Sequence, residues 1–389
     1  MTQRAGFQPA LQLPDLRQTS GNTSALSAAR WHGNVQDGIA TGESMRQNMR
    51  KTISFIVPAF NMSEYLDRCV GSLIAAQSVD DIEVIIVDDG STDATAQLAD
   101  AWTAKMPGIV RTIHQPNKGH GGAVNTGVAH AHGDYVKVVD ADDWVGPDAL
   151  ERVLAVLRRQ QGNENPIDLL ITDYVYDKVG KRHKHVVCFD NVMQPNTRLT
   201  WDDLGRFGVA QYMIMHSITY RTDVLRRSGL RLPEHTFYVD FIYSYQPFPQ
   251  VRTLMYLDVP FYHYFIGRSG QSVQTDVMIR RVDQLQLVNR AMAEATPEPD
   301  MVPEGLYRYM IHFLSINSVV TSAFLILSRD SRNYAAKTQL WQRIDTMSPA
   351  IGHDVRHKAV SRAINLPGKT GRFIVRQGYR VAERIVGFN

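Results

Sequence analysis

This chain contains little cysteine and little net charge. Cys69 and Cys188 are the only cysteines in its 389 residues, too few for a disulfide framework and typical of a reducing compartment. The formal net charge is +3, so the chain lacks the basic footprint of a nucleic-acid-binding protein, and no nucleic-acid partner is expected. The histidines and cysteines show no metal-ligand spacing. The first residues lack a continuous apolar run, so no signal peptide is predicted.

What the chain does contain, from residue 53 onward, is an alternation of apolar β-rich runs and helical patterns. Strands are predicted at 53–58, 82–87, about 109–114 and 135–139. Helical patterns follow the first three strands, over about 64–77, after residue 92, and up to residue 131. This alternation is typical of βαβ units on a parallel sheet, in which ligands bind beyond the carboxyl ends of the strands.

Four polar loops follow these strands, around Asn61, Asp89, Asn117 and Asp142, so all four are expected on the ligand side of the sheet. The last loop has the spacing D-x-D. Its residues Asp140 and Asp142 could share a hard divalent cation, because such ions prefer oxygen ligands and often retain diphosphate oxygens in their shell. The alternative is a helix N-cap with extra surface acids.

Residues 119–122 (Gly-His-Gly-Gly) form a glycine-rich helix start with two possible interpretations. The glycines either let the helix pack tightly on the sheet, or present N–H groups to an anion or sugar, with Lys118 and His120 as additional donors. No G-x-G-x-x-G sequence follows the first strand after Pro58, which argues against an NAD-dependent enzyme.

Four segments together resemble the inverting family 2 glycosyltransferases of the GT-A fold. They are ISFIVPAFN, IEVIIVDDGSTD, NKGHGGAVNTG and GDYVKVVDADDWVGPDAL, within about residues 52–160, and a weaker similarity extends to about residue 274. The resemblance implies an α/β fold of the GT-A type, with a Rossmann-like, mostly parallel sheet flanked by helices. The predicted division is a disordered leader at 1–50, a GT-A domain at 51–275, and a helical C-terminal region with a basic tail at 276–389.

The resemblance also implies roles for single residues. Residues 58–60 would line the base pocket, Asp89 would bind the pyrimidine edge, usually of uracil, and Asp140 would face the ribose or the sugar. Asp142 would bind Mg²⁺ or Mn²⁺ at the diphosphate, where the ion neutralises charge on the leaving group. The predicted nucleotide-sugar contacts are Pro58, Ala59, Phe60, Asn61, Glu64, Asp89, Asn117, Lys118, Gly119, Gly122, Asp140, Ala141 and Arg268.

The catalytic base implied by the resemblance is Asp240, which stands where the family commonly has Glu-Asp before a helix. Val239 replaces the Glu here, so the match is partial. Asp173 and Asp177, expected to follow the end of a strand, are the next candidates. Arg268 either holds the diphosphate or an anionic acceptor, or belongs to a polar turn after an aromatic strand.

Two C-terminal segments bear on membrane contact. Residues 306–327 are apolar and almost long enough to cross a bilayer, but polar residues interrupt them, which favours a buried helix. Residues 356–384 are basic, with an arginine at every fourth position from Arg372 to Arg384. This tail is predicted to form either a cationic amphipathic helix on a bilayer surface or a solvated helical face.

We therefore expect an inverting, metal-dependent glycosyltransferase that moves a sugar from a UDP-sugar to a hydroxyl of a glycan, a cell-surface polysaccharide or a lipid-linked acceptor. The processive-synthase signature Q-x-x-R-W is absent, which favours single sugar additions. The expected location is the cytoplasm, with contact at the inner face of the cell membrane. The alternatives are a nucleotidyltransferase-type nucleotide-sugar enzyme and a non-catalytic carbohydrate-binding relic of the same fold.

Overall fold

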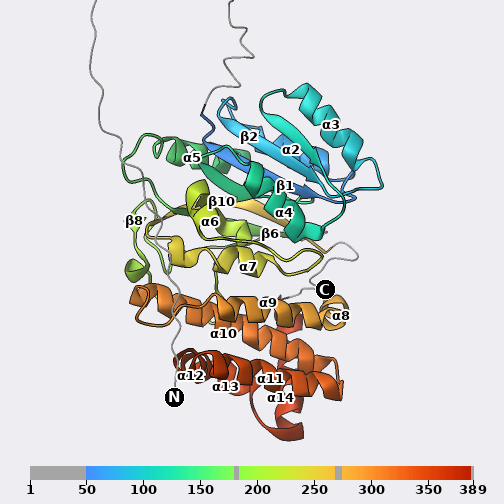
Figure 1. Ribbon diagram of the computed structural model, residues 1–389, viewed down its shortest axis with the longest axis vertical. Helices are drawn as coiled ribbons and strands as arrows, with labels where there is room; N and C mark the ends of the chain where they lie inside the picture. Colours follow the sequence, from blue (N-terminus) through green and yellow to red (C-terminus); the bar gives the residue numbers. More distant parts are fainter. Residues whose placement is uncertain (1–49, 179–183, 268–273, 387–389) are drawn as a thin grey trace, which may run out of the picture. The chain divides into compact units, whose positions relative to one another are not determined.

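The computed structural model describes residues 50–178, 184–267 and 274–386, with no side-chain description for residues 382–386. The predicted leader, apart from Arg50, and the predicted ligand Arg268 lie outside these residues. In the described part of the chain, a mixed α/β region is followed by a set of helices (Figure 1).

A ten-stranded sheet organises the α/β region, in the order β3-β2-β1-β4-β9-β6-β10-β5, with β7 paired to β6 and β8 to β10. Its strands are β1 (Ile53–Ala59), β2 (Ile82–Asp88), β3 (Val110–His114), β4 (Tyr135–Val138), β5 (Trp144–Val145), β6 (Leu169–Lys178), β7 (His185–Val187), β8 (Arg198–Leu199), β9 (Ile218–Arg221) and β10 (Leu254–Ile266). The first four strands pair in parallel, as predicted. Their carboxyl ends therefore lie at one edge of the sheet.

The short strand β9 joins two parallel halves of this sheet. It runs antiparallel to both β4 and β6, and β6 then pairs in parallel with β10. This arrangement places the ends of β6 and β10 beside the loop that follows β4. The second half of the sheet thus contributes side chains to the same edge as the first.

Helices flank the sheet and bury its strands. They are α2 (Leu66–Leu73), α3 (Thr95–Lys105), α4 (Gly119–His130), α5 (Pro147–Arg158), α6 (Thr222–Arg227) and α7 (Asp240–Tyr245). The short 3₁₀ turns are η1 (Trp201–Asp203), η2 (Met215–Ser217) and η3 (Phe248–Gln250). Strands β1 and β2 are buried at every position, because neighbouring elements cover both of their faces. This explains why their sequences are continuous apolar runs rather than alternating ones.

Two local predictions are wrong. The helix expected over 64–77 begins at Leu66 and ends at Leu73, because only the stretch that places Leu66, Cys69, Val70 and Leu73 against the core stays helical. Asp173 and Asp177 do not follow a strand; they lie inside β6, whose pairing with β10 continues to Lys178. The long partner strand β10 extends β6 beyond the apolar run that the sequence displays.

The C-terminal region consists of helices packed around α10. They are α8 (Thr275–Arg280), α9 (Val282–Glu294), α10 (Glu304–Leu327), α11 (Ser331–Met347), α12 (Pro349–His357), α13 (Ala359–Ile364) and α14 (Gly368–Val386). Helix α10 is long and apolar enough to cross a membrane, but 72% of its apolar window is buried inside the protein. This agrees with the predicted buried helix. The predicted domain boundary at residue 275 stays a prediction.

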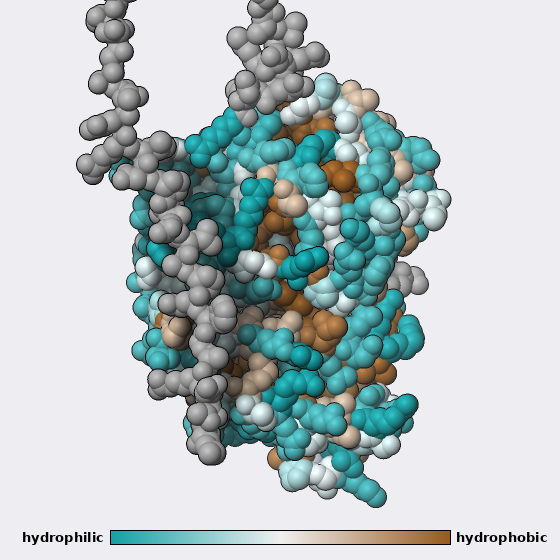
Figure 2. Space-filling model, in the orientation of Figure 1, coloured by the Kyte–Doolittle hydropathy of each residue, from teal (hydrophilic) through white to brown (hydrophobic). Residues whose placement is uncertain are grey.

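Three buried polar residues on α10 accept hydrogen bonds from neighbouring helices. Asn289 Nδ2 on α9 donates to Asn317 Oδ1 and to Ser318 Oγ, both at 2.9 Å. Trp341 Nε1 on α11 donates to Ser322 Oγ at 3.0 Å. These bonds fix the positions of the helices, because an unpaired polar group in a core is costly. The viewed surface is mainly hydrophilic, with apolar residues in a narrow seam (Figure 2).

Candidate active site at the carboxyl edge of the sheet

Asp89 follows β2 and is almost completely buried, with 2% of its surface exposed. Its Oδ1 accepts hydrogen bonds from Gln115 Nε2 at 2.6 Å and from the Lys118 backbone N–H at 2.9 Å. Its Oδ2 is buried and has no hydrogen-bond partner among the described residues. A buried carboxylate oxygen without a donor is costly, so this atom is well suited to accept an N–H from a ligand.

The end of β1 and the loop after it hold the predicted base-pocket residues. Pro58 and Ala59 lie inside β1, and the Ala59 carbonyl accepts the Asp89 N–H at 2.8 Å. Phe60 is 44% exposed, so its ring is open to stacking with a planar group. Asn61 has the left-handed φ of 54° and its Oδ1 accepts the Thr92 N–H at 2.8 Å. Asn61 therefore joins the first loop to the second.

Two other predicted contacts have different surroundings. Glu64 is exposed. Asn117 Nδ2 donates to the Asp89 carbonyl at 2.9 Å, so Asn117 holds the second and third loops together. Among the described residues, the predicted pyrimidine ligand and its neighbours thus form one hydrogen-bonded unit.

The glycine-rich start of α4 packs closely against the segment that leads to α7. Gly119 has φ 73°, and a Cβ there would stand 2.8 Å from the His235 backbone nitrogen. That nitrogen donates to the Lys118 carbonyl at 2.8 Å. A Cβ at Gly121 would stand 2.5 Å from the Pro233 carbonyl oxygen. The glycines thus allow residues 233–235 to approach α4. This observation favours the interpretation that the glycines serve close packing.

A histidine–carboxylate pair lies at the end of β4. The His120 Nε2–H on α4 donates to Asp140 Oδ1 at 2.7 Å. Burial lowers the pKa of His120, but the nearby Asp140 carboxylate outweighs it, and Asp240 and Asp142 act in the same direction, so the pKa is raised. The surrounding acids thus favour the protonated form of His120.

Asp240, the first residue of α7, belongs to the same group of charges. Burial raises its pKa to about 6, with His120 lowering it and Asp140 raising it. Two residues upstream, Tyr238 has a left-handed φ of 65°, and His235 has 49°. Non-glycine residues are strained in this conformation, which is common at functional sites. The strained segment brings Asp240 to the end of β4.

The D-x-D loop itself is anchored by Asp143. This side chain is fully buried. Its Oδ2 accepts the Tyr262 hydroxyl at 2.5 Å and its Oδ1 accepts the Phe265 N–H at 2.7 Å, both from β10. The Asp142 carbonyl accepts Arg68 Nη2 at 2.7 Å. We call Asp140, Asp142, Asp143 and Asp240 the acidic edge.

Possible metal ligands occur at this edge. Among the described residues, Asp140, Asp143 and His216 have ligand atoms within 4.8 Å of one another. Burial lowers the pKa of His216 to about 4, so its imidazole is neutral and able to bind a metal. The predicted ligand Asp142 lies in the same loop but is outside this set of three. A hard cation fits the carboxylates, although both oxygens of Asp143 already accept hydrogen bonds.

Lys137, in the middle of β4, is a site-supporting residue that sequence reasoning missed. Its side chain is fully buried, and its Nζ donates to the carbonyls of Met215 at 3.2 Å and Ile218 at 3.1 Å, as well as to that of His216. Lys137 thereby holds the turn η2 and its His216 beneath the acidic edge. In the sequence, a single lysine within an apolar strand was the feature that could have indicated this role.

An aromatic wall next to Asp240 was also missed. The Asp240 carboxylate contributes to raising the pKa of Tyr176, Tyr212 and Tyr264, after burial as the main cause. Tyr212 stacks near Phe241, with ring centroids 5.9 Å apart. Aromatic faces are suitable surfaces for the apolar face of a sugar ring. The run of aromatic residues in β10 could have indicated Tyr264 from the sequence. Tyr212 lies in a loop, where no hydrophobic periodicity marks it.

The alternative bases are engaged elsewhere. Asp173 accepts the Tyr256 hydroxyl at 2.7 Å, and burial raises its pKa to about 7. Asp177 pairs with Lys184 at 2.5 Å and lies 3.5 Å from His263 Nδ1. Asp240 is thus the candidate whose carboxylate shares its electrostatic environment with His120 and Asp140.

Residues 54–216, which contain the loops around Asp89 and Asp142, match the model of Glycosyl transferase family 2. This part of the chain is a family 2 glycosyltransferase domain. The EpsH protein of Bacillus subtilis (strain 168) is 30% identical over 232 residues, which cover 56% of this chain and 62% of EpsH. Chondroitin synthase of Escherichia coli is 44% identical over 107 residues, which cover 28% of this chain and 15% of that protein. The chain thus spans less than two thirds of either relative.

The family 2 domain also has a known fold. A crystal structure of S. aureus TarS, residues 1–349, in complex with UDP-GlcNAc superposes with a TM-score of 0.59 at 20% identity. The match covers 84% of this chain and 92% of the TarS chain. The predicted α/β fold of the GT-A type, with a helical C-terminal region, is therefore confirmed.

Proposed function

We propose that this protein is an inverting, metal-dependent glycosyltransferase that uses a UDP-sugar and a polysaccharide or related glycan as acceptor. The observation that carries the proposal is the convergence of Asp240, His120 and Asp140 at the carboxyl edge of a family 2 domain. The polysaccharide acceptor is suggested by the relatives named chondroitin synthase and hyaluronan synthase. The UDP-sugar donor is suggested by the TarS complex with UDP-GlcNAc.

Asp89 accounts for the choice of uridine. Its Oδ2 is buried without a donor among the described residues, and its backbone N–H bonds to Ala59, which directly precedes the exposed Phe60. A uracil ring offers an N–H that this oxygen can accept, and its flat face can stack on the exposed Phe60 ring. A ligand that leaves Asp89 Oδ2 unpaired would bind less tightly, because the cost of burial would not be offset.

Asp142 and Asp140 would hold the divalent ion, with His216 as a further neutral ligand within reach. The ion supplies charge neutralisation at the diphosphate when bound. The chain's own contribution is to fix the loop: Asp143 is bonded to β10 and the Asp142 carbonyl to Arg68. A fixed loop spares reorganisation of the carboxylates during the reaction.

Asp240 would act as the general base. The carboxylate takes the proton of the acceptor hydroxyl, whose oxygen forms a bond to the anomeric carbon as the bond from that carbon to the diphosphate oxygen breaks. Attack from the side opposite the leaving group inverts the configuration. With a pKa raised to about 6, Asp240 is ionised at neutral pH but is a stronger base than an ordinary aspartate.

The test is a donor screen on the purified protein. Hydrolysis and transfer are measured for UDP-, GDP- and dTDP-sugars with and without Mn²⁺, and the anomeric configuration of the product is determined by NMR. We expect metal-dependent turnover of a UDP-sugar with inversion. A retained configuration would overturn the proposed mechanism, and turnover of only GDP- or dTDP-sugars would overturn the donor assignment.

We further propose that the basic tail contacts an anionic membrane surface. On α14, Phe373, Ile374 and Val381 are 58%, 49% and 56% exposed, an unusual arrangement for a helix that also carries several arginines. Arg372 and Arg376 face inward: Arg372 lies over the Tyr334 ring at 4.6 Å, and Arg376 Nη2 donates to the Tyr334 hydroxyl at 2.6 Å. The apolar side chains, more than these arginines, would enter the bilayer surface.

A further inference from the structure

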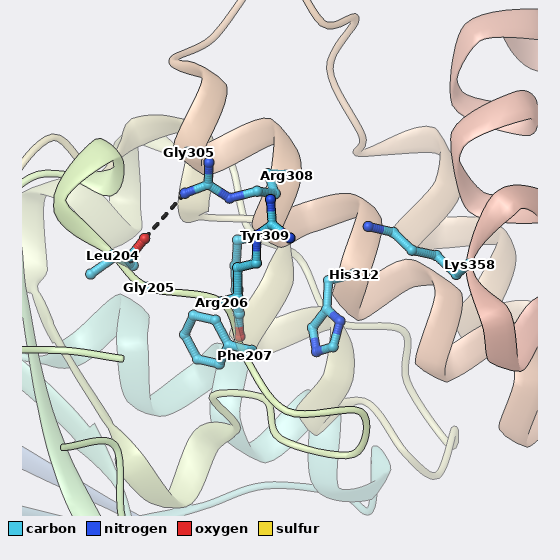
Figure 3. Close-up of a pocket in the computed structure, with 9 residues that line it drawn as sticks. All are labelled: Leu204, Gly205, Arg206, Phe207, Gly305, Arg308, Tyr309, His312 and Lys358. Carbon is cyan, nitrogen blue, oxygen red and sulfur yellow. Dashed lines mark hydrogen bonds between the residues drawn. The ribbon is translucent and has the colours of Figure 1, made fainter. Parts of the chain in front are cut away.

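A cavity of about 340 Å³ lies in the C-terminal half of the protein, apart from the residues of the acidic edge. Three parts of the chain line it: the loop after η1, the first turns of α10, and the junction between α12 and α13 (Figure 3). The loop supplies Arg206, α10 supplies Arg308 and His312, and the junction supplies Lys358. Figure 3 shows Lys358 reaching across from its own segment toward α10. We call this site the cationic cavity.

The positive charges in the cationic cavity have few partners. Arg308 Nη2 donates to the Leu204 carbonyl at 3.1 Å and lies 4.0 Å from Glu304, which is 90% exposed at the rim. The side chains of Arg206 and Lys358 have no hydrogen-bond or ion-pair partner among the residues that the structure describes. Asp354 is the acid that raises the pKa of Lys358, and its carboxylate accepts the Tyr307 hydroxyl at 2.9 Å. The site therefore has excess positive charge.

These cations also affect one another. The pKa of Lys358 is lowered, mainly by burial, and the like charges of Arg206 and Arg308 contribute to the same shift, while Asp354 opposes it. Lys358 in turn contributes to lowering the pKa of His312, again after burial. Like charges that converge on a half-buried cavity repel each other, and an anion between them would remove that cost.

The walls of the cavity are held in place by hydrogen bonds to the backbone. The His312 Nε2–H donates to the Gln211 carbonyl at 2.9 Å. The Tyr309 hydroxyl accepts the Met213 N–H at 2.8 Å. The intervening residue, Tyr212, belongs to the aromatic wall at Asp240. The loop from Arg206 to Tyr212 thus runs from the cationic cavity to the candidate active site.

We propose that the cationic cavity binds a phosphoryl group, either free in solution as phosphate or diphosphate or as the head group of a lipid. Three cations from three separate segments suit an anion with several oxygens and more than one charge. A single carboxylate offers two oxygens, which one guanidinium can satisfy alone. A phosphoryl group can instead accept bonds from both arginines and from the lysine together. This proposal does not depend on the sugar-transfer reaction.

Binding of inorganic diphosphate is measured by isothermal titration calorimetry on the full chain, in EDTA so that a metal-bound diphosphate at the acidic edge is absent. The test variant is Arg206→Gln/Lys358→Gln, which removes two charges without breaking a side-chain hydrogen bond or ion pair among the described residues. The matched control is Arg252→Gln/Lys369→Gln, two exposed cations outside the cavity. We expect the dissociation constant to rise about tenfold or more in the test variant and to change less than about twofold in the control.

Two further arms separate the sources and exclude the active site. Vesicles of phosphatidylcholine with and without phosphatidic acid test a lipid phosphate, and binding that depends on Arg206 and Lys358 supports the proposal through that source. Added uridine, which carries no phosphoryl group, should leave diphosphate binding unchanged, because uridine would compete only at the proposed nucleotide pocket around Asp89. Melting temperatures of all variants establish that each is folded, and the single variant Arg206→Gln, at an exposed position, replaces the double variant if that one is unstable.

Three results would overturn the proposal. The first is equal diphosphate binding by the parent and the folded cavity variant. The second is no binding of phosphate, diphosphate or phosphatidic acid by the parent protein. The third is binding of glucuronate at this site in preference to phosphate, which would assign the cavity to carboxylates.

Discussion

The acidic edge and the cationic cavity manage charge in opposite ways. At the acidic edge, two of the four acids are held by partners within the protein: Asp140 Oδ1 accepts the His120 Nε2–H, and Asp143 accepts bonds from β10. In the cationic cavity, Arg206 and Lys358 have no such partner among the described residues. The first site is organised before any ligand arrives, whereas the second lacks the group that would balance it. The comparison teaches that partners within the protein fix carboxylates of the first site, whereas the cations of the second site are left for a ligand to balance.

The largest effect should come from replacing Asp142, the proposed metal ligand of the acidic edge. Asp142→Ala should abolish turnover and the metal-dependent part of UDP binding, because the diphosphate charge would no longer be neutralised. Turnover and UDP affinity are measured with and without Mn²⁺. His216→Gln serves as the comparison, since His216 belongs to the set of three close ligand atoms and Asp142 does not. Full activity of the parent enzyme in excess chelator would refute metal dependence.

The next effect tests whether Asp240 is a base or only the first residue of α7. Asp240→Asn keeps the shape but removes the basicity, and loss of a general base typically costs about 10²–10⁴-fold in rate. We expect at least a hundredfold lower kcat for transfer, with UDP affinity and melting temperature nearly unchanged. Asp283→Asn, an exposed acid on α9, is the control. Transfer at close to the parent rate would exclude Asp240 and direct attention to Asp173 or Asp177.

The pH profile sharpens the same assignment. Burial raises the pKa of Asp240 to about 6, so the carboxylate gains a proton as the pH falls through 6 and loses its basicity. The rate of transfer should therefore be level near neutral pH and decline about tenfold per pH unit well below 6. Initial rates across pH 4.5–8 check this. A profile that declines only near the ordinary pKa of an aspartate would contradict the role of burial.

A smaller effect is expected at Asp89, on the nucleotide side of the acidic edge. UDP should raise the melting temperature more than GDP or ADP, and Asp89→Ala should remove the difference. The lost hydrogen bond to a charged group corresponds to about a tenfold or larger change in the dissociation constant of UDP. Thermal shift and calorimetry measure both, with Asp283→Ala as the control. Equal shifts from all three nucleotides would disprove uridine selection.

The smallest effect concerns the exposed apolar side chains of α14. Phe373→Ser/Ile374→Ser should reduce sedimentation with anionic vesicles several-fold while sparing hydrolysis of a soluble donor, because the loss of apolar burial weakens surface binding. Met301→Ser removes an exposed apolar side chain elsewhere and is the control. If the α14 variant sediments like the parent at low salt, the tail does not mediate membrane contact.

Much of the nucleotide side of the candidate site could be read from local patterns. The end of each buried strand was visible as a change from apolar to polar residues, so Asp89 and Asp140 could be placed at the sheet edge. Lys137, Tyr212 and His216 were not found, because their roles depend on contacts with residues far away in the chain. Asp173 and Asp177 were placed after a strand, but the pairing of β6 with β10 carries the strand past them.

The sequence by itself determined the alternation of strands and helices, the order of the polar loops and the buried character of α10, because these follow from local hydrophobic periodicity. Only the tertiary structure decided which charges meet. Asp240 reaches His120 and Asp140 because the strained segment at His235 and Tyr238 packs on the glycines of α4. Arg206, Arg308 and Lys358 converge because three separate segments surround one cavity. The physical reason is that electrostatic interactions depend on distance in space, which periodicity along the chain does not encode.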